Sequence, residues 1–110
     1  MSALFSYGTL RQREVQLATY GRELDGRPDA LIGYRLEPLH ITDSRVVALS
    51  GNAVHNIARA TGDPADRIEG VVFELSREEL ESTDAYEVDA YARAEVTLES
   101  GRKAFVYVSG

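Results

Sequence analysis

Cysteine is absent from this sequence, and the absence excludes disulfide bonds and metal sites built from thiolates. Histidine is scarce as well: His40 and His55 are the only two, and they are too far apart for the i, i+4 spacing of a helical metal site. The glycines form neither a Gly-x-Gly-x-x-Gly motif nor a phosphate-binding loop. We therefore expect no metal and no cofactor. A chain without cysteine is compatible with the cytosol, and we expect a cytoplasmic location.

Basic residues are outnumbered by acidic ones, 12 to 18, which gives a formal net charge of −6. Nonspecific binding to nucleic acid depends on a basic surface, so this charge argues against a DNA or RNA partner. No apolar run approaches the ~20 residues that cross a bilayer. The N-terminus lacks the basic segment and long apolar stretch of a signal peptide. We expect neither a nucleic acid nor a membrane as partner.

The length of 110 residues suits one hydrophobic core, so we expect a single domain over residues 1–110. The polar segment 22–28 is predicted to be a loop, and the last two strands to form a hairpin through Gly101. Strands are predicted at residues 3–7, 46–49, 54–60, 67–75, 91–98 and 103–108, with an extended segment at 30–41. Two helical patterns accompany them without βαβ alternation. The organisation predicts an α+β fold, a small mixed or antiparallel β-barrel with two flanking helices.

A capping box marks the start of the second predicted helix. Ser76 stands at the N-cap position, and Glu79 follows three residues later. The helix should run to about Tyr86 or Glu87. Glu87 then lies above Leu80, the one large aliphatic residue of the helix and the marker of its buried side. A carboxylate on that side is unusual, because burying an unpaired charge is costly.

Two interpretations of Glu87 follow from the residues alone. It is either a structural carboxylate paired with Arg93, or a half-desolvated acid with a raised pKa that moves protons. Asp84 and Asp89 are near in sequence, and their like charges would raise the pKa of Glu87 further. In the following strand, Tyr91 and Arg93 share one face and come close behind Glu87.

The N-terminal segment contains a turn between a strand and a helix. Gly8 ends the strand, and Thr9 and Gln12 form a weaker capping box, with Thr9 at the N-cap. The helix begins there or one turn later, and Gly21 ends it. A turn of this kind can expose backbone N–H groups as a pocket for an anion.

Three stretches together resemble the gamma-glutamylcyclotransferase-like family. Residues 4–10, LFSYGTL, are similar to the family's hydrophobic-x-Tyr-Gly-(Thr/Ser)-Leu signature. Residues 84–87, then Tyr91-x-Arg93, then the final Val-Tyr-Val of 106–108 look like its second signature. Residues 70–75, GVVFEL, stand where the family has a central strand. The resemblance covers most of the chain, in the right order.

The resemblance implies a small β-barrel enzyme that cleaves γ-glutamyl amides by intramolecular aminolysis, giving 5-oxoproline and a free amine or amino acid. Glu87 matches the family's general acid/base, and Tyr91 and Arg93 match supporting positions beside it. The family's substrate loop matches Tyr7, Gly8, Thr9 and Leu10. The implied partner is a small γ-glutamyl substrate, bound by a monomer or homodimer without metal or cofactor.

The sequence departs from the family pattern at three places. Val88 stands where many members have Gly, and the linker from Glu87 to Tyr91 is short. Residues 55–58 stand where many members carry a Pro-containing stretch, on the side of the leaving group. Two alternatives to the enzyme remain: a non-catalytic module of the same fold that binds a small ligand, and a protein of related fold whose partner is another protein. Fold alone does not decide between them.

Overall fold

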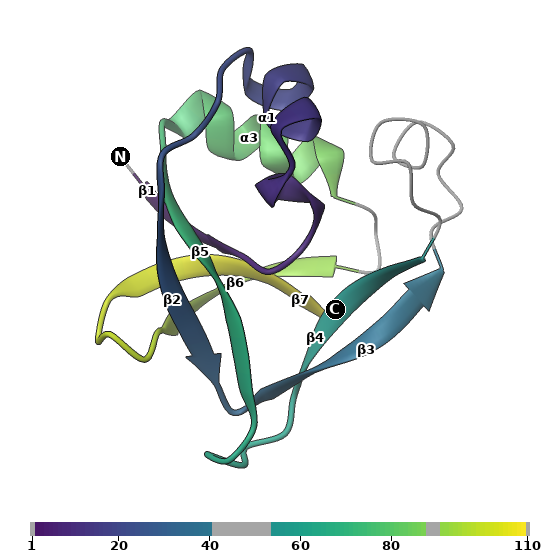
Figure 1. The fold of residues 1–110 in the computed structure, drawn as a ribbon, viewed down its shortest axis with the longest axis vertical. Coiled ribbons are helices and arrows are strands. Elements are labelled where there is room, and N and C mark those ends of the chain that lie inside the picture. Colours follow the sequence, from purple (N-terminus) through teal and green to yellow (C-terminus); the bar gives the residue numbers. More distant parts are fainter. Residues whose placement is uncertain (1, 41–53, 88–90, 110) are drawn as a thin grey trace.

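The computed structural model describes residues 2–40, 54–87 and 91–109. Within these ranges the chain forms a mixed α+β structure with one seven-stranded sheet (Figure 1). The helical elements are η1 (Thr9–Arg11, a 3₁₀ turn), α1 (Arg13–Tyr20) and α3 (Arg77–Tyr86). The strands are β1 (Ser2–Ser6), β2 (Gly26–Ile32), β3 (Tyr34–His40), β4 (Val54–Ala60), β5 (Arg67–Leu75), β6 (Tyr91–Thr97) and β7 (Lys103–Ser109).

The sheet runs in the order β2-β5-β1-β7-β4-β3, and β6 pairs with β7 outside this path. Most neighbours are antiparallel, including the predicted hairpin of β6 and β7. The central strand β7 lies parallel to β1 and β4, with Leu4 opposite Phe105 and Ala58 opposite Val108. The expectation of a mixed sheet is therefore confirmed, and the N-terminal strand β1 lies beside the C-terminal strand β7.

The expected closure into a barrel was wrong, because the sheet is open and its path ends at β2 and β3. These two end strands are separated only by Gly33, whose φ of +84° lies in the left-handed region. One residue is too short to turn a chain back on itself as a hairpin. β2 and β3 therefore form one bent segment, which pairs with β5 along its first half and with β4 along its second.

The segment 22–28 was predicted to be a loop, but β2 begins inside it, at Gly26. The prediction was misled by Pro28, which lacks a backbone N–H and usually weakens a strand. β2 is an end strand, with β5 as its one neighbour in the sheet path, so a proline is tolerated there. The strand predicted at 46–49 lies outside the described residues.

Both faces of the sheet are packed, as the alternating side chains of β1 show. Leu4 belongs to a cluster on the helical side with Leu10, Val15 and Leu80. Phe5, the next residue, belongs to a second cluster, which includes Leu31, Ile68, Val72 and Val106. The two clusters hold β1, β6 and β7 in place, and these strands carry or adjoin several of the candidate site residues.

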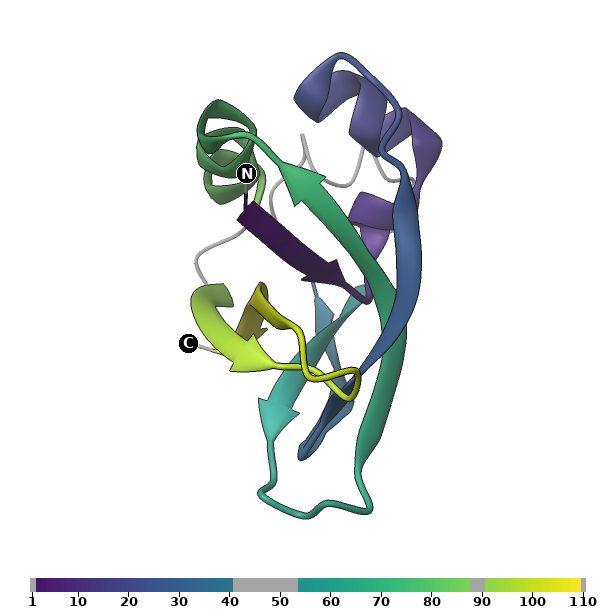
Figure 2. The same ribbon diagram turned by 90° about the vertical axis from the view of Figure 1, so that its left-hand side faces the viewer.

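Helices α1 and α3 lie side by side at one end of the sheet (Figures 1 and 2). The capping box of α3 is confirmed: the Ser76 hydroxyl accepts from the Glu79 N–H at 3.1 Å, and the Ser76 N–H donates to the Glu79 carboxylate at 2.9 Å. α1 begins at Arg13, the later of the two expected starts, and Thr9 does not cap it. The predicted stop at Gly21 is confirmed, with a φ of +71°.

Candidate active site

A cavity of about 340 Å³ opens beside the turn that follows β1. The end of β1 and the turn that follows it, together residues 5–12, form one wall. The opposite side is lined by Asn56 of β4, Glu87 at the end of α3, Tyr91 of β6 and Tyr107 of β7. Segments from both ends of the chain therefore meet around one hollow, large enough for a small molecule.

Backbone N–H groups are available on the turn. Arg11 and Gln12 donate their N–H groups back to the carbonyls of Gly8 and Thr9 as the 3₁₀ turn forms. The N–H groups of Gly8, Thr9 and Leu10 donate to no acceptor among the described residues. Such groups at the start of a helical turn are free to receive an anionic or carbonyl oxygen. Gly8 has a φ of −126°, outside the left-handed region, so the turn does not require a glycine for its backbone conformation.

Side chains hold this turn in place. The buried Gln16 donates from its amide nitrogen to the Leu10 carbonyl at 2.9 Å, and its amide oxygen accepts from the Leu24 N–H at 2.9 Å. Arg11 donates to the Gly8 carbonyl at 3.2 Å. With the carbonyls of the turn engaged in this way, its orientation does not depend on a ligand.

Glu87 stands at the C-cap of α3, where its N–H still donates to the Thr83 carbonyl at 3.0 Å. Its carboxylate accepts no hydrogen bond and forms no ion pair with any described residue. Although the side chain is only partly buried by exposed area, protein atoms replace most of the water around it. Burial raises the pKa of Glu87 to about 8. Asp84, which we expected to contribute, is not a cause of this rise, and Asp89 lies outside the described residues.

Five tyrosines lie close enough to Glu87 for its charge to affect them. Burial is the main cause that raises the pKa of each phenol, and the negative charge of Glu87 raises it further. For Tyr20 the resulting pKa is about 12. The other four tyrosines whose pKa is raised in this way are Tyr7, Tyr86, Tyr91 and Tyr107.

The phenol of Tyr7 is committed to the backbone. It donates to the Tyr107 carbonyl at 2.5 Å and accepts from the Ala58 N–H at 2.9 Å. These two groups belong to β7 and β4, which share a single register pair. The hydroxyl thus bridges β4 and β7 where these strands share few backbone hydrogen bonds, and its proton is not available to a ligand.

Two more phenols donate away from Glu87. Tyr91 donates to the Asn56 carbonyl at 2.8 Å. Tyr20 lies 2.5 Å from the Thr83 hydroxyl, whose own proton goes to the Glu79 carbonyl at 2.9 Å, so Tyr20 must be the donor. These protons are therefore unavailable to the carboxylate.

One of our two interpretations required an ion pair between Glu87 and Arg93, and the structure does not contain it. The Arg93 guanidinium donates to Asp84 at 3.0 Å and lies 5.1 Å from the centre of the Phe105 ring. The second oxygen of Asp84 accepts from the Tyr107 hydroxyl at 2.5 Å. Asp84 is thus satisfied by two partners, and Arg93 stands behind the cavity wall rather than in it.

Most of the predicted site residues meet at the cavity. Glu87 and Tyr91 line it together with Tyr7, Gly8, Thr9 and Leu10, whereas Arg93 does not. The side chain of Leu10 is buried in the core. The sequence analysis missed Asn56 and Tyr107, which line the cavity, and Tyr86, whose hydroxyl lies 2.6 Å from that of Thr9. Tyrosines in a strand or helix look like packing residues, and only their clustering in space identifies them.

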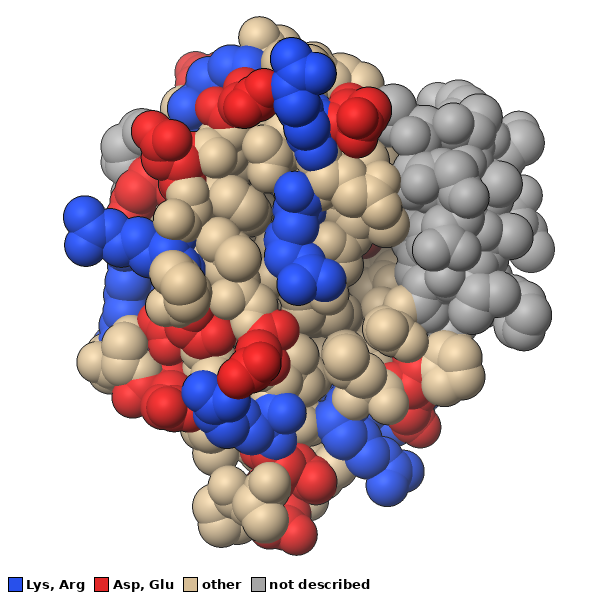
Figure 3. Space-filling model, in the orientation of Figure 1, with Lys and Arg blue, Asp and Glu red and all other residues tan. Residues whose placement is uncertain are grey.

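On the face in Figure 3, acidic and basic side chains are interspersed rather than gathered by sign. Among the described residues, no three His, Asp or Glu side chains come together in a way that could hold a metal ion. None of the helices in the described ranges is both long and apolar enough to cross a membrane.

Comparison with known families decides the relationship. Residues 4–110 match the model of the family described as "Gamma-glutamyl cyclotransferase, AIG2-like". The chain belongs to this family. The motifs that suggested it, at residues 4–10, 70–75 and 84–108, all lie within the match. No curated protein matched the chain.

Solved structures show the same fold. A protein titled "Gamma-glutamyl cyclotransferase" superposes with a TM-score of 0.75 at 16% identity, over 99% of this chain and 66% of its own. The uncharacterized protein PH0828 from Pyrococcus horikoshii has a TM-score of 0.67 at 23% identity, over 100% and 79%. The protein At3g28950.1 from Arabidopsis thaliana has a TM-score of 0.71 at 22% identity, over 98% of this chain and 61% of its own. At these identities the likeness is one of fold, and each of these chains is longer than this one.

Proposed function

We propose that this protein is a cyclotransferase that cleaves a γ-glutamyl amide by intramolecular aminolysis, releasing 5-oxoproline and a free amine or amino acid. One observation carries the proposal. Glu87, with a pKa raised to about 8 by burial, lines the same 340 Å³ cavity as a turn whose N–H groups are free. Membership of the family supports the reaction class.

The reaction needs two proton transfers, and one carboxyl group can perform both. The Glu87 carboxylate takes a proton from the substrate's α-ammonium, and the freed amine attacks the γ-carbonyl carbon to close a five-membered ring. The protonated Glu87 then gives its proton to the leaving nitrogen, the γ-amide C–N bond breaks and the carbonyl re-forms. After these two transfers through Glu87, the ring nitrogen still holds one extra proton. It passes that proton to the departing amine, which leaves as an ammonium ion beside neutral-ring 5-oxoproline. A pKa near 8 suits both steps, because Glu87 can then both accept and return a proton close to neutral pH.

The turn supplies binding rather than proton transfer. The free N–H groups of Gly8, Thr9 and Leu10 are suited to hold the glutamyl end of the substrate or the oxyanion of the tetrahedral intermediate. Because the turn is held by Gln16 and Arg11 without a ligand, its donors need little reorganisation on binding. The cavity phenols titrate far above neutral pH and their protons have other acceptors, so they do not compete with Glu87.

The test is a product assay on a panel of γ-glutamyl amino acids and γ-glutamylamines, with 5-oxoproline as the measured product. Glu87→Gln keeps the shape of the side chain and removes its titrating proton, so it should abolish turnover while leaving ligand affinity nearly unchanged. Glu78→Gln is the matched control, because Glu78 is an exposed residue on the same helix. Product formation that survives Glu87→Gln would rule out the mechanism.

The second candidate is a non-catalytic module that binds a small carboxylated ligand in the same cavity. It predicts a structural Glu87 with a depressed pKa, held by a cation. Arg93 is already paired with Asp84, and burial raises the pKa of Glu87, so both observations favour the enzyme. Titration of the Glu87 carboxyl carbon by carbon-13 NMR separates the two: a pKa below 4 supports the binding module.

A further inference from the structure

The two halves of the proposed site are far apart in sequence and need a physical connection. The turn lies at residues 7–10 and Glu87 some eighty residues later, at the end of α3. Three polar contacts join the N-terminal segment to α3, one at each of three positions along the helix. Their α3 members are Glu79, Thr83 and Tyr86, which follow the i, i+4, i+7 spacing of a single helix face.

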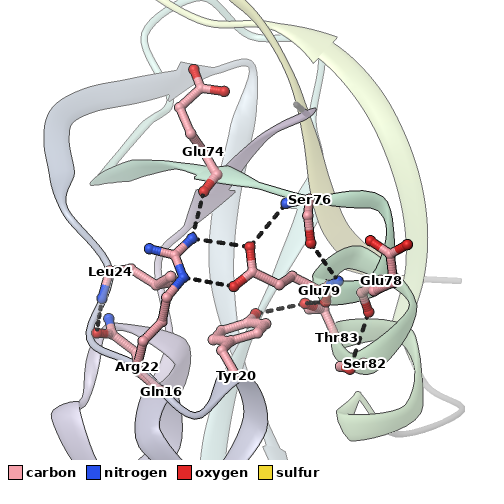
Figure 4. A network of polar contacts seen from close by, with 10 residues as sticks. All are labelled: Gln16, Tyr20, Arg22, Leu24, Glu74, Ser76, Glu78, Glu79, Ser82 and Thr83. Carbon is pink, nitrogen blue, oxygen red and sulfur yellow. Dashed lines mark hydrogen bonds and ion pairs between the residues drawn. The ribbon is translucent and has the colours of Figure 1, made fainter.

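The first two contacts dock α1 and the chain after it. Arg22 forms a bidentate pair with Glu79, with nitrogen–oxygen distances of 2.8 and 3.0 Å. Tyr20 donates to Thr83 at 2.5 Å. Figure 4 shows both contacts with the capping box at the start of α3. Neither Tyr20 nor Arg22 lines the cavity.

The third contact reaches the site itself. The hydroxyls of Thr9 and Tyr86 lie 2.6 Å apart, and this bond is partly buried. Thr9 is a member of the turn whose N–H groups are free, and Tyr86 directly precedes Glu87. No other side-chain hydrogen bond among the described residues joins residues 7–12 to α3. The bond therefore spans from the proposed binding group to the proposed acid/base.

We propose that the Thr9–Tyr86 hydrogen bond is a positioning contact that sets the separation between the N–H groups of the turn and the Glu87 carboxylate. This inference rests on the proposed function. Misplacement of a reacting group by about 1 Å can lower a rate about 100-fold. Loss of the bond should therefore act on the chemical step, since the turn still binds the glutamyl group through its own backbone.

The variants are Tyr86→Phe and Thr9→Val, alone and combined, with Thr9→Ser as the conservative replacement that restores the hydroxyl. Each single variant should lower kcat about 10- to 100-fold with KM within about twofold of the parent. The double variant should be no worse than either single one, because both remove the same bond. Thr9→Ser should retain the parental kcat.

Tyr20→Phe is the matched control. It removes one phenol hydroxyl and one hydrogen bond from the same face of α3, but from a contact that does not touch the turn. It should lower the melting temperature as much as Tyr86→Phe does and leave kcat unchanged. The inference is overturned if Tyr86→Phe and Tyr20→Phe have equal kcat, or if the effects of Thr9→Val and Tyr86→Phe multiply.

A readout that does not depend on turnover separates this inference from the proposed function. If the parent protein forms no 5-oxoproline from any panel substrate, the proposed function fails. The contact is then tested by carbon-13 titration of Glu87. Thr9→Val and Tyr86→Phe should each admit water to the cavity and shift the pKa of Glu87 toward its ordinary value, whereas Tyr20→Phe should not. An unchanged Glu87 titration in both variants overturns the positioning role.

Discussion

Two glutamates stand at opposite ends of α3 and differ in nearly everything except their side chain. Glu79, in the first turn, accepts from the Ser76 N–H and from two nitrogens on one edge of the Arg22 guanidinium. The pairing with Arg22 is the main cause that lowers the pKa of Glu79 to about 2. Glu87, at the last position, has no described partner, and burial raises its pKa to about 8. The polarity of the helix acts in the same directions, because its N-terminus favours a negative charge and its C-terminus opposes one.

The difference shows that partners and depth together decide what a carboxyl group does. Glu79 has 15% of its side chain exposed but lies nearer the protein surface than Glu87, and it remains a structural anion because the Ser76 N–H and the Arg22 guanidinium donate to it (Figure 4). Glu87 faces phenols whose protons are already given to other acceptors. The following predictions test the difference between Glu79 and Glu87.

The largest expected effect is on turnover. Glu87→Gln should lower kcat by on the order of 1,000-fold, because it removes the acid and the base of both proton transfers. Glu79→Gln should change kcat less than about threefold when the protein is folded. Steady-state release of 5-oxoproline measures both. A larger loss of kcat in Glu79→Gln than in Glu87→Gln would reverse the assignment of roles.

The same substitution should have opposite effects on stability at the two positions. Above pH 8 the folded protein carries an ionised, buried Glu87, so Glu87→Gln should raise the free energy of unfolding by roughly 2–4 kcal/mol. Glu79→Gln should lower it by roughly 1–2 kcal/mol near neutral pH, because the charged pair with Arg22 is lost. Denaturant unfolding at pH 9 and pH 7 measures these changes. Destabilisation by Glu87→Gln at pH 9 would contradict the unpaired state of this carboxyl.

The pH dependence should also run in opposite directions. Glu79 has a folded-state pKa below 4.5, so its contribution is present above pH 4.5 and is lost as pH falls toward 2. Glu87 has a folded-state pKa above 4.5, so its ionisation costs stability progressively as pH rises from 4.5 to about 8. The melting temperatures of Glu79→Gln and the parent should therefore converge as pH falls from 4.5 toward 2. Those of Glu87→Gln and the parent should separate as pH rises from 4.5 to about 8. Parallel curves for Glu87→Gln and the parent above pH 5 would show an ordinary Glu87.

The rate should follow a bell-shaped curve with pH. Reaction needs one proton shared between Glu87 and the substrate amine: at low pH both are protonated and no base remains, and at high pH neither holds a proton for the leaving nitrogen. With the pKa of Glu87 at about 8, kcat/KM should be greatest at or just above pH 8 and fall on both sides, the slope approaching tenfold per pH unit away from the maximum. A flat profile between pH 6 and 9 would contradict this.

The smallest effect on stability is expected at Gly8. Its φ is −126°, and a Cβ atom placed there would meet nothing within 4 Å, so Gly8→Ala should change the free energy of unfolding by less than about 1 kcal/mol. The added methyl group should nevertheless crowd a ligand held by the turn and raise KM several-fold. Thermal melts and KM measurements test both parts. Normal KM in a folded Gly8→Ala protein would show that this glycine does not approach the substrate.

Local signals in the sequence predicted the parts of the fold that are decided locally. Ser76 and Glu79 satisfy each other within one turn, so the start of α3 can be read from four residues. The closure of the sheet could not be predicted in this way, because it depends on which strands pair across the chain and on a bend at Gly33 that a run of apolar residues conceals.

The candidate site shows the same division. The position of Glu87 on the buried side of its helix followed from its spacing to Leu80. The cause of its raised pKa did not, because Asp84 is engaged by Arg93 and Tyr107 from a distant strand. Thr9 was predicted to cap a helix, but its hydroxyl lies against Tyr86, a partner 77 residues away that no local pattern could suggest.

The bridging phenol of Tyr7 has a consequence for the motions of the molecule. The β3–β4 pair joins the rest of the sheet through Gly33 at one end. Elsewhere β4 is attached through one register pair with β7, through the Tyr7 hydroxyl, and through the hydrogen bond from Tyr91 to Asn56. A segment with so few attachments is expected to open as a unit at a lower free energy than β5, which is paired along both sides. Amide hydrogens of β3 and β4 should exchange with solvent first. Because Asn56 of β4 lines the cavity, we expect such an opening to move part of the cavity wall.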